Sequence, residues 1–308
     1  MSKINVCISS DDNYAKYLGV VAASILKNAN TDDEIAFYFL DGGIKEEKKQ
    51  EIFSLKEIKD CEMNFVKVDE ELFSQYAKIK THKYITIATY YRLKLPTLLP
   101  SVDKIIYLDC DTVVNSSLKD LFEIDLKENL IAGAKDINKK MLKKNPSYVN
   151  AGMLVFNLAQ MRKENTEEKF LAWTKENFET IKVGDQTILN EVCKGRILLV
   201  NDVWNVQSSN FTNRSSYTNS PKIIHFVSKK KPWHFASFSY HRDLYFKYLQ
   251  LTPWRLSEAE LKHWTKDNQI ASLIEYFKYR PLFFLRPRFY EAIFKTYILN
   301  FKKGKNNV

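Results

Sequence analysis

The first 68 residues alternate short apolar runs with longer stretches in which apolar residues recur at helical spacing. The apolar runs predict buried strands at Ile4–Ser9, Ile35–Leu40 and Phe65–Val68. The stretches between them predict two helices, one over residues 14–25 and a charged one over residues 45–58. Neighbouring parallel strands need long crossover connections, which are usually helices, so this order predicts a parallel sheet covered by helices.

The rest of the chain continues the same pattern. Further strands are predicted over residues 104–108, 130–134, 152–158, 197–200 and 223–227. Helices are predicted over residues 84–95, ending at the break made by Pro96, and over residues 159–179 and 185–193. No low-complexity linker precedes residue 250. We therefore expect one α/β domain over residues 1–250, followed by a helical C-terminal region over residues 251–308.

Glycine and cysteine usage excludes several classes of protein. The chain has only eight glycines and no Gly-x-Gly, so it contains neither a dinucleotide-binding fingerprint nor a Walker A loop. Its four cysteines form no Cys-x-x-Cys pair, which argues against a structural zinc site and fits reduced thiols in a cytosol. Two early aspartates interrupt any signal-peptide core, and no apolar run approaches the roughly 20 residues that cross a bilayer. We therefore expect a cytoplasmic location.

The apolar strand at 104–108 leads directly into two acids, Asp109 and Asp111. Alternate residues of a strand point to the same face, so both carboxylates are expected on one side. Two carboxylates in an apolar setting repel each other unless a cation or a proton lies between them. Together with an imidazole from His225, they suit Mn²⁺, with Mg²⁺ as the alternative. A solvated turn with two acids is the simpler interpretation, but the preceding buried strand favours a metal site.

Three further segments place polar groups near predicted strand ends. Asn150–Gly152 precedes an apolar strand and permits close approach of the backbone to a bound group, or simply a tight entry into the strand. Gly184–Asp185 predicts an N-cap for a helix that starts at Gln186. Lys231 follows His225 by six residues and offers a point cation to a phosphate, although a lysine run is more often a solvated face.

Six segments in a fixed order carry a resemblance to a known family. They read SSDDNYA, TYYRLKL, YLDCDTVV, NAGMLVFNL, GDQTILN and HFVSKKKPWH. Between about residues 3 and 235 the chain resembles the family 8 glycosyltransferases, especially the bacterial lipooligosaccharide and lipopolysaccharide α-galactosyl- and α-glucosyltransferases. The resemblance implies a GT-A fold, which is a Rossmann-like, mixed and mostly parallel sheet with helices on both faces. It also implies transfer of a hexose from a UDP-sugar with Mn²⁺ and retention of the anomeric configuration.

The resemblance assigns roles to individual residues. Asp109, Asp111 and His225 match the metal ligands, and Asp185 and Gln186 match the catalytic positions beside the anomeric carbon. The donor-binding positions are Asp11, Asn13, Tyr14, Arg92, Asp109, Cys110, Asp136, Asn150, Ala151, Ser228 and Lys231.

The donor-binding positions divide by the part of the UDP-sugar that they match. Asp11, Asn13 and Tyr14 match contacts to uridine and ribose, and Lys231 matches a contact to the diphosphate. The sugar-side positions are Arg92, Asp136, Asn150 and Ala151. Ser228 departs from the family, which usually has glycine there, so a backbone contact to phosphate is expected to be altered or replaced by the hydroxyl.

The expected chemistry follows from charge. Breaking the bond between sugar and phosphate leaves a diphosphate and an oxocarbenium-like sugar, and the metal and Lys231 are expected to stabilise the leaving group. Retention follows either from a covalent sugar–enzyme species on Asp185 or from attack on the face that the diphosphate leaves. Gln186 is a poor nucleophile, and we favour same-face attack with the departing phosphate accepting the proton. The sequence does not distinguish galactose from glucose.

The last 33 residues, 276–308, differ in character from the rest. They contain ten aromatic residues and eight cations against one acid, Glu291. This composition predicts a membrane-associating tail on an anionic surface, at the inner face of the cytoplasmic membrane. Nucleic-acid binding and packing of the aromatic residues onto the body are the alternatives. Because the acceptors of the resembled family are lipid-linked oligosaccharides, we favour the membrane and expect no nucleic-acid partner.

Two other functions fit parts of the sequence. The segment from Ile105 to Thr112 also matches the start of a haloacid-dehalogenase phosphatase, with Asp109 as nucleophile and Asp111 as acid/base. That motif usually opens its domain, whereas three predicted strands precede it here. A non-catalytic, membrane-associated sugar-binding protein is the other alternative, and the intact set of acids, His225 and Lys231 argues against it.

Overall fold

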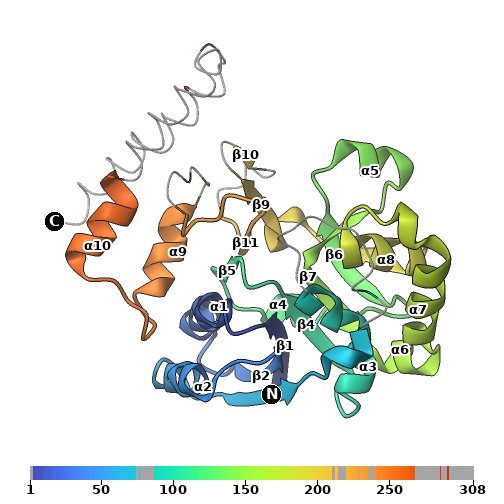
Figure 1. The fold of residues 1–308 in the computed structure, drawn as a ribbon, viewed down its shortest axis with the longest axis horizontal. Coiled ribbons are helices and arrows are strands. Elements are labelled where there is room, and N and C mark those ends of the chain that lie inside the picture. The colour runs from blue at the N-terminus through green and yellow to red at the C-terminus, as the bar shows by residue number, and fades with distance from the viewer. Residues whose placement is uncertain are drawn as a thin grey trace.

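The computed structural model describes residues 3–73, 76, 87–209, 212–213, 220–227, 229–234, 237, 239, 241–267, 285 and 290. A large sheet runs through the molecule with helices on both sides, and a smaller sheet lies beside it (Figure 1). The predicted α/β class is therefore confirmed.

Within the described residues, the large sheet has seven strands in the order β3-β2-β1-β4-β7-β6-β8. In chain order they are β1 (Lys3–Ser10), β2 (Glu34–Asp41), β3 (Glu62–Lys67), β4 (Lys104–Leu108), β6 (Ile131–Lys135), β7 (Val149–Asn157) and β8 (Ile197–Leu199). β7 runs antiparallel to its neighbours β4 and β6, and the remaining pairs are parallel. The sheet is therefore mixed and mostly parallel, as predicted.

Helices and short 3₁₀ turns connect these strands. The helices are α1 (Ala15–Asn28), α2 (Glu46–Phe53), η3 (Ile87–Lys94, a 3₁₀ helix), α3 (Leu95–Leu98), α4 (Lys119–Phe122), α5 (Lys139–Lys144), α6 (Leu158–Lys163), α7 (Thr166–Asn177) and α8 (Gly184–Val192). The single helix predicted over residues 159–179 is instead α6 and α7, because Asn165 between them has a left-handed φ of 50°. Pro96 does not end a helix: it lies in the first turn of α3, where its missing N–H is not needed.

Alternate side chains of the central strands pack into two separate cores, one on each face of the sheet. In β4, Ile106 and Leu108 point into the core that contains α1, whereas Ile105 and Tyr107 point into the core that contains η3 and α8. Strands buried on both faces explain the continuous apolar runs in the sequence. The prediction of helices on both faces is confirmed.

The smaller sheet was only partly anticipated. Within the described residues its order is β10-β9-β11-β5, made from β5 (Thr112–Val114), β9 (Val206–Ser209), β10 (Thr212–Asn213) and β11 (Ile223–Phe226). β5 and β11 share a third apolar cluster with α9 (Arg242–Leu249). The β4–β5 connection therefore passes from one sheet to the other, which brings β11 next to the end of β4.

Two strand boundaries differ from the prediction in ways that matter for the site. β7 begins at Val149, three residues earlier than expected, so Asn150 and Gly152 lie inside the strand. β4 ends at Leu108, so the acids that follow it lie in a turn.

The C-terminal region is described only in part. α10 (Glu258–Lys262) is followed by a short π-helix, His263–Asp267. Residues 285 and 290 excepted, the predicted tail at 276–308 lies outside the described residues. Among the described residues, no helix has the length and apolar character that crossing a membrane requires.

Candidate active site

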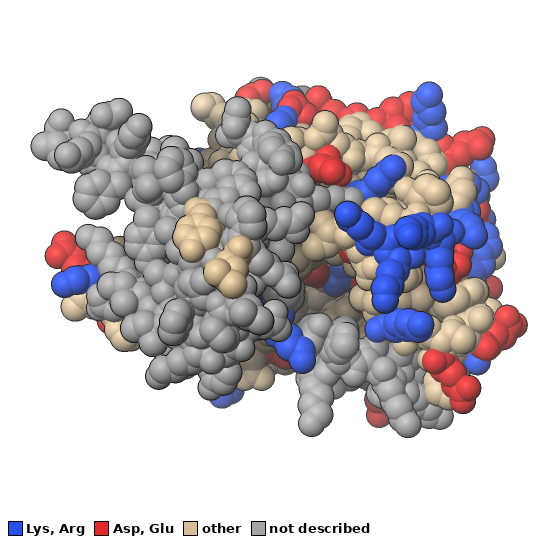
Figure 2. Space-filling model, turned by 90° about the horizontal axis from the view of Figure 1, so that it is seen from above, with Lys and Arg blue, Asp and Glu red and all other residues tan. Residues whose placement is uncertain are grey.

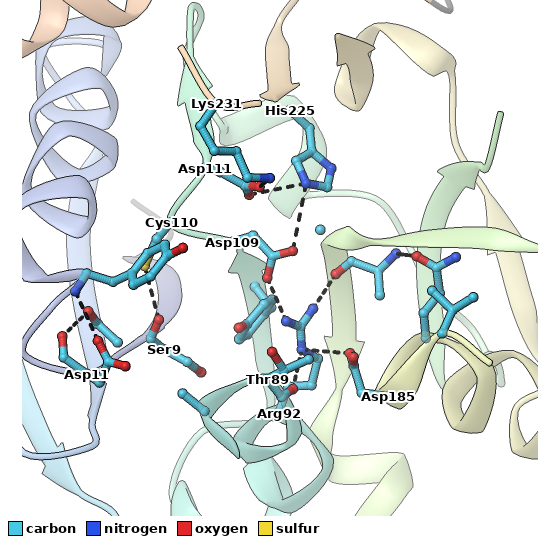
Figure 3. Close-up of a pocket in the computed structure, with 18 of the residues that line it drawn as sticks. Ser9, Asp11, Thr89, Arg92, Asp109, Cys110, Asp111, Asp185, His225 and Lys231 are labelled. Carbon is cyan, nitrogen blue, oxygen red and sulfur yellow. Dashed lines mark hydrogen bonds and ion pairs between the residues drawn. The ribbon is translucent and has the colours of Figure 1, made fainter. Parts of the chain in front are cut away.

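A cavity of about 540 Å³ opens at the carboxyl ends of β1 and β4 (Figure 3). Ligands of open α/β sheets bind at this edge, because the strand ends there project side chains and free backbone groups into one crevice. The lining residues are Ser9, Ser10, Asp11, Tyr14, Ala88, Thr89, Arg92, Tyr107, Asp109, Cys110, Asp111, Ala151, Gly152, Val183, Asp185, Gln186, His225, Lys229, Lys231 and His234. Most residues predicted to bind the donor therefore meet here.

Asp109 and Asp111 lie in the turn between β4 and β5. The prediction that strand alternation aligns them is wrong, because the strand has already ended. The turn is held by hydrogen bonds from the Asp109 N–H to the Gly152 carbonyl (3.0 Å) and from the Thr112 hydroxyl to the Asp109 carbonyl (2.9 Å). His225 on β11 faces both acids, with Nε2 3.2 Å from Asp111 Oδ1 and 3.8 Å from Asp109 Oδ2. The three predicted metal ligands therefore lie together.

Asn150 fixes the orientation of the His225 ring. Its Oδ1 lies 3.0 Å from His225 Nδ1 and accepts hydrogen bonds from Gly152 N–H and from Asn205 Nδ2, each at 3.1 Å. An amide oxygen only accepts, so Nδ1 of His225 carries the proton and Nε2 presents its lone pair to the acids. A hydrogen bond of this kind usually orients the histidine ligands of metals.

Gly152 makes room for the same ring. A Cβ at this position would lie 2.0 Å from Cε1 and 2.4 Å from Nδ1 of His225, so no larger residue fits without moving the imidazole. The sequence predicted close approach of this backbone to a bound group. In the structure the group that lies against Gly152 is instead a side chain of the protein, the His225 ring.

The donor set of this cluster fits a divalent cation. One ligand atom from each of Asp109, Asp111 and His225 lies within 4.8 Å of the others. Among the described residues, Oδ1 of Asp111 is buried and has no hydrogen-bond donor. Buried carboxylate oxygens are ordinarily hydrogen-bonded, so an oxygen without a donor that faces an imidazole lone pair is compatible with a metal ligand.

Lys231 lies at the other oxygen of Asp111. Its Nζ is 2.5 Å from Asp111 Oδ2 and 2.8 Å from the Phe226 carbonyl oxygen. Burial alone would raise the pKa of Asp111, but the Lys231 ammonium opposes this, and the pKa of Asp111 lies below its usual range. Asp111 is therefore ionised, and a cation stands next to the candidate ligands.

Arg92 organises the opposite wall of the cavity (Figure 3). Its guanidinium is 3% exposed, donates to Asp109 Oδ1 at 2.6 Å and lies 3.1 Å from Asp185 Oδ2. It also donates to the Ala151 carbonyl at 2.6 Å and stacks on the Tyr107 ring, with Cζ 4.0 Å from the ring centroid. Burial alone would lower the pKa of Arg92, but the two carboxylates raise it, so the buried guanidinium stays charged.

Asp185 is a buried partner of Arg92 and not a helix cap. α8 begins at Gly184, and its N-cap residue, Val183, makes no side-chain capping bond, so the predicted N-cap at Gly184–Asp185 is wrong. The carboxyl group of Asp185 turns into the cavity because Arg92 attracts it. Burial raises the pKa of Asp185 to about 6, and Arg92 opposes this rise.

Gln186 uses its amide inside the site. Its Oε1 accepts from the Ala151 N–H (3.1 Å) and from Asn150 Nδ2 (3.2 Å), and its Nε2 donates to Asp136 Oδ2 at 3.2 Å. Asp136 Oδ2 also accepts from Asn150 Nδ2 at 3.0 Å. These bonds join the ends of β6 and β7 to α8, so the Gln186 side chain is part of the site.

The other predicted donor residues differ in where they lie. Asp11 and Tyr14 line the cavity, and Asp11 Oδ1 accepts from the Tyr14 N–H at 3.0 Å. Asn13 is exposed and is not among the lining residues. The Cys110 thiol donates to a β1 carbonyl at 3.1 Å, and burial raises the pKa of Cys110 well above its usual value, so it is a neutral thiol. Ser228 lies outside the described residues.

Sequence reasoning assigned no role to several lining residues. Thr89 accepts from Arg92 Nε through its carbonyl oxygen at 3.0 Å, and Tyr107 carries the guanidinium of Arg92 on its ring. His234 Nδ1 accepts from the Lys231 N–H at 3.2 Å, and burial lowers the pKa of His234. All three occur within the sequence segments quoted above, next to residues that were assigned.

A mixed sheet with an acidic turn at the end of a central strand, facing an imidazole from a second sheet, is the architecture of a GT-A glycosyltransferase. The chain belongs to glycosyl transferase family 8, whose sequence model matches residues 5–237.

Curated relatives and a solved structure agree with this assignment. A Haemophilus influenzae protein named as a glycosyltransferase is 37% identical over 211 residues, which are 66% of this chain and 63% of that protein, so this chain spans less than two thirds of that relative. The lipopolysaccharide 1,2-glucosyltransferase of Escherichia coli is 24% identical over 328 residues, covering 97% of this chain and 91% of that protein. The crystal structure of galactosyltransferase LgtC with donor and acceptor sugar analogs matches with a TM-score of 0.72 and 26% identity, over 83% of this chain and 98% of that one.

Proposed function

We propose that the chain is a retaining hexosyltransferase. It moves galactose or glucose from a UDP-sugar to a hydroxyl of a lipooligosaccharide- or lipopolysaccharide-type acceptor, and Mn²⁺, or Mg²⁺ in its place, binds at Asp109, Asp111 and His225. The observation that carries the proposal is the convergence of these three side chains, with Lys231 beside them, on one wall of a cavity in a family 8 chain. The similarity to LgtC and to a lipopolysaccharide glucosyltransferase supports the donor and acceptor classes.

The chain's own residues stabilise the leaving group through position and charge. When bound, the metal supplies a Lewis acid for the diphosphate. Lys231 lies 2.5 Å from Asp111, so its ammonium is within reach of a phosphate held at the same ligands. Asp11 and Tyr14 line the other end of the cavity, where the nucleoside would lie.

The sugar end is organised by Arg92, Asp185 and Gln186. Both hydrogen bonds accepted by Gln186 Oε1 come from β7, so this amide positions the sugar pocket and does not attack. Asp185 forms an ion pair with Arg92. The pairing makes its carboxylate a weaker nucleophile and so argues against a covalent sugar–enzyme species. These contacts support attack of the acceptor hydroxyl on the face that the diphosphate leaves, with the departing phosphate accepting the hydroxyl proton.

Incubation with a panel of UDP-hexoses tests the function. We expect UDP release with UDP-galactose or UDP-glucose in the presence of Mn²⁺, complete loss after chelation, and recovery when Mn²⁺ is restored. Lys231→Ala should reduce turnover by about 10²–10³-fold, because one donor to the leaving group is lost. The intact mass of the protein during turnover should stay unmodified, since an adduct on Asp185 would establish the covalent route instead.

The same experiment separates the alternatives. Phosphate release from a phosphomonoester, without UDP release, would establish the phosphatase with Asp109 as nucleophile. Binding of UDP-sugars with no turnover in any metal would establish the sugar-binding protein.

The tail at 276–308 is proposed to bind the anionic inner face of the cytoplasmic membrane, where lipid-linked acceptors are met. Its eight cations support this, since each basic residue near such a surface contributes about 1 kcal/mol. Replacing all eight by glutamine in the full chain should abolish flotation with phosphatidylglycerol vesicles at low salt and leave UDP-hexose hydrolysis unchanged. Undiminished flotation of that variant would reject the proposal.

A further inference from the structure

The segment between Asp136 and Asn150 begins and ends at the site and forms an excursion away from it in between. At its start, the Asp136 carboxylate accepts from Gln186 and Asn150, and at its end Asn150 orients His225. Gln207 of β9 holds the first turn, since it donates to the Lys135 carbonyl (2.9 Å) and accepts from the Ile137 N–H (3.1 Å). The excursion is therefore anchored at both ends on groups beside the sugar pocket.

The outer part of this segment is strongly basic. From Lys135, just before Asp136, to Lys144 the chain has five lysines, and its one acid, Asp136, is buried and hydrogen-bonded to Asn150 and Gln186. The five lysines, all exposed, are Lys135, Lys139, Lys140, Lys143 and Lys144. Figure 2 shows the face that lies at the top of Figure 1, where α5 is on the right. On this face Lys and Arg side chains form a compact group.

The lysines of α5 destabilise their own helix. Asn138 caps this helix through its side chain, which accepts from the Lys140 and Met141 N–H groups. Lys139 and Lys143, and likewise Lys140 and Lys144, are then like charges one helical turn apart, which destabilises a helix. In the described part of the chain, none of these four lysines is ion-paired with a carboxylate. Their positive charge is therefore available to an anionic group of a bound molecule.

We infer that this basic excursion, Lys135–Lys144, binds anionic substituents of the acceptor glycan, phosphate or carboxylate groups on sugars next to the one that is attacked. The inference rests on the proposed function, because it takes the sugar pocket to be the place where acceptor and donor meet. Lys139 follows Asp136 by three residues, so their Cα atoms are at most about 11 Å apart. An anionic group near the attacked sugar is therefore within reach of the lysine side chains, whereas a neutral glycan leaves the charge uncompensated.

The test compares three sugars that differ in charge. Glucose, glucose 6-phosphate and glucose 1,6-bisphosphate are titrated into the full chain with saturating UDP and Mn²⁺, so that the diphosphate site is filled. The variant has Lys139, Lys140, Lys143 and Lys144 replaced by glutamine, and the control has four exposed lysines far along the chain, Lys56, Lys67, Lys175 and Lys194, replaced in the same way. UDP-hexose hydrolysis and thermal unfolding are recorded for each protein.

We expect binding to strengthen with each phosphate in the wild-type and control proteins. In the α5 variant the bisphosphate should bind about tenfold more weakly than in the wild type, with glucose binding and UDP-hexose hydrolysis unchanged. Equal binding of all three sugars by wild type and α5 variant would overturn the inference. So would loss of phosphatidylglycerol vesicle binding by the α5 variant with sugar-phosphate binding intact, which would assign these lysines to the membrane. A wild-type chain that does not hydrolyse any UDP-hexose would contradict the proposed function, while charge-dependent binding lost only in the α5 variant would still establish an anion site.

Discussion

Asp111→Asn should lower kcat for UDP-hexose turnover by at least about a thousandfold. Asparagine has nearly the same shape but lacks the charge, so the cluster keeps one carboxylate and His225 where three ligands converge. The measurement is UDP release under saturating donor and Mn²⁺, together with the rise in Tm on adding Mn²⁺, which should disappear. Asp120→Asn is the matched control, because Asp120 forms an exposed ion pair with Lys222 and neither residue lines the cavity. Turnover within tenfold of the wild type in Asp111→Asn would contradict the metal site.

Gly152→Ala tests the same cluster without removing any ligand. Its Cβ must displace the His225 ring, so Mn²⁺ affinity should fall by about 10–100-fold, the range seen when the surroundings of a ligand are disturbed. Gly43→Ala is the control: Gly43 has a φ of 95° and no neighbour to meet a Cβ, so it strains the backbone without touching the site. Gly43→Ala should lower Tm and leave Mn²⁺ affinity unchanged. Equal affinity in both variants would show that His225 does not bind the metal.

Arg92→Met should destabilise the folded protein by about 3–5 kcal/mol, because it leaves the buried carboxylate of Asp185 and the half-buried one of Asp109 without their cation. Asp109 and Asp185 both lie against the guanidinium, and methionine also removes the donor to the Ala151 carbonyl. The measurement is the free energy of unfolding from urea denaturation at neutral pH.

Removing one of the stranded carboxylates should recover part of this loss. In the double variant Arg92→Met/Asp185→Asn we expect a coupling free energy of about 0.5–3 kcal/mol, as for residues in direct contact. Arg255→Met, at an exposed arginine, should change stability by less than about 0.5 kcal/mol. If Arg92→Met costs no more than this exposed substitution, Arg92 does not hold the two acids together.

Much of the fold could be predicted because it depends on local patterns. β1, β2 and β4 are buried on both faces, and their continuous apolar runs mark them in the sequence. Errors came where the pattern is ambiguous. The apolar spacing over 159–179 does not show that Asn165 turns the chain between two helices, and β5 is too short to have a period.

The residues of the site could be predicted from the sequence, but the contacts between their side chains could not. Asp109, Asp111, His225 and Lys231 were identified from residue types at strand ends and from the family resemblance, and the structure brings them together. The partnership of Arg92 with Asp185 was missed, because the polar context of Gly184–Asp185 is that of a helix cap. The spacing of residues along the chain indicates where a helix starts. It does not indicate which charged side chain from another helix or strand will lie next to that start.

The sequence by itself determined the alternation of strands and helices, the buried strand that ends at two acids, and the family to which the chain belongs. All three depend on patterns of residues that are close together along the chain. Only the tertiary structure decided which groups meet: Asn150 with His225 across 75 residues, Arg92 with the Ala151 carbonyl across 59, and Lys231 with Asp111 across 120. The physical reason is that the ends of separate strands share one crevice. A buried charge there takes the partner that packing places beside it, whatever the distance along the chain.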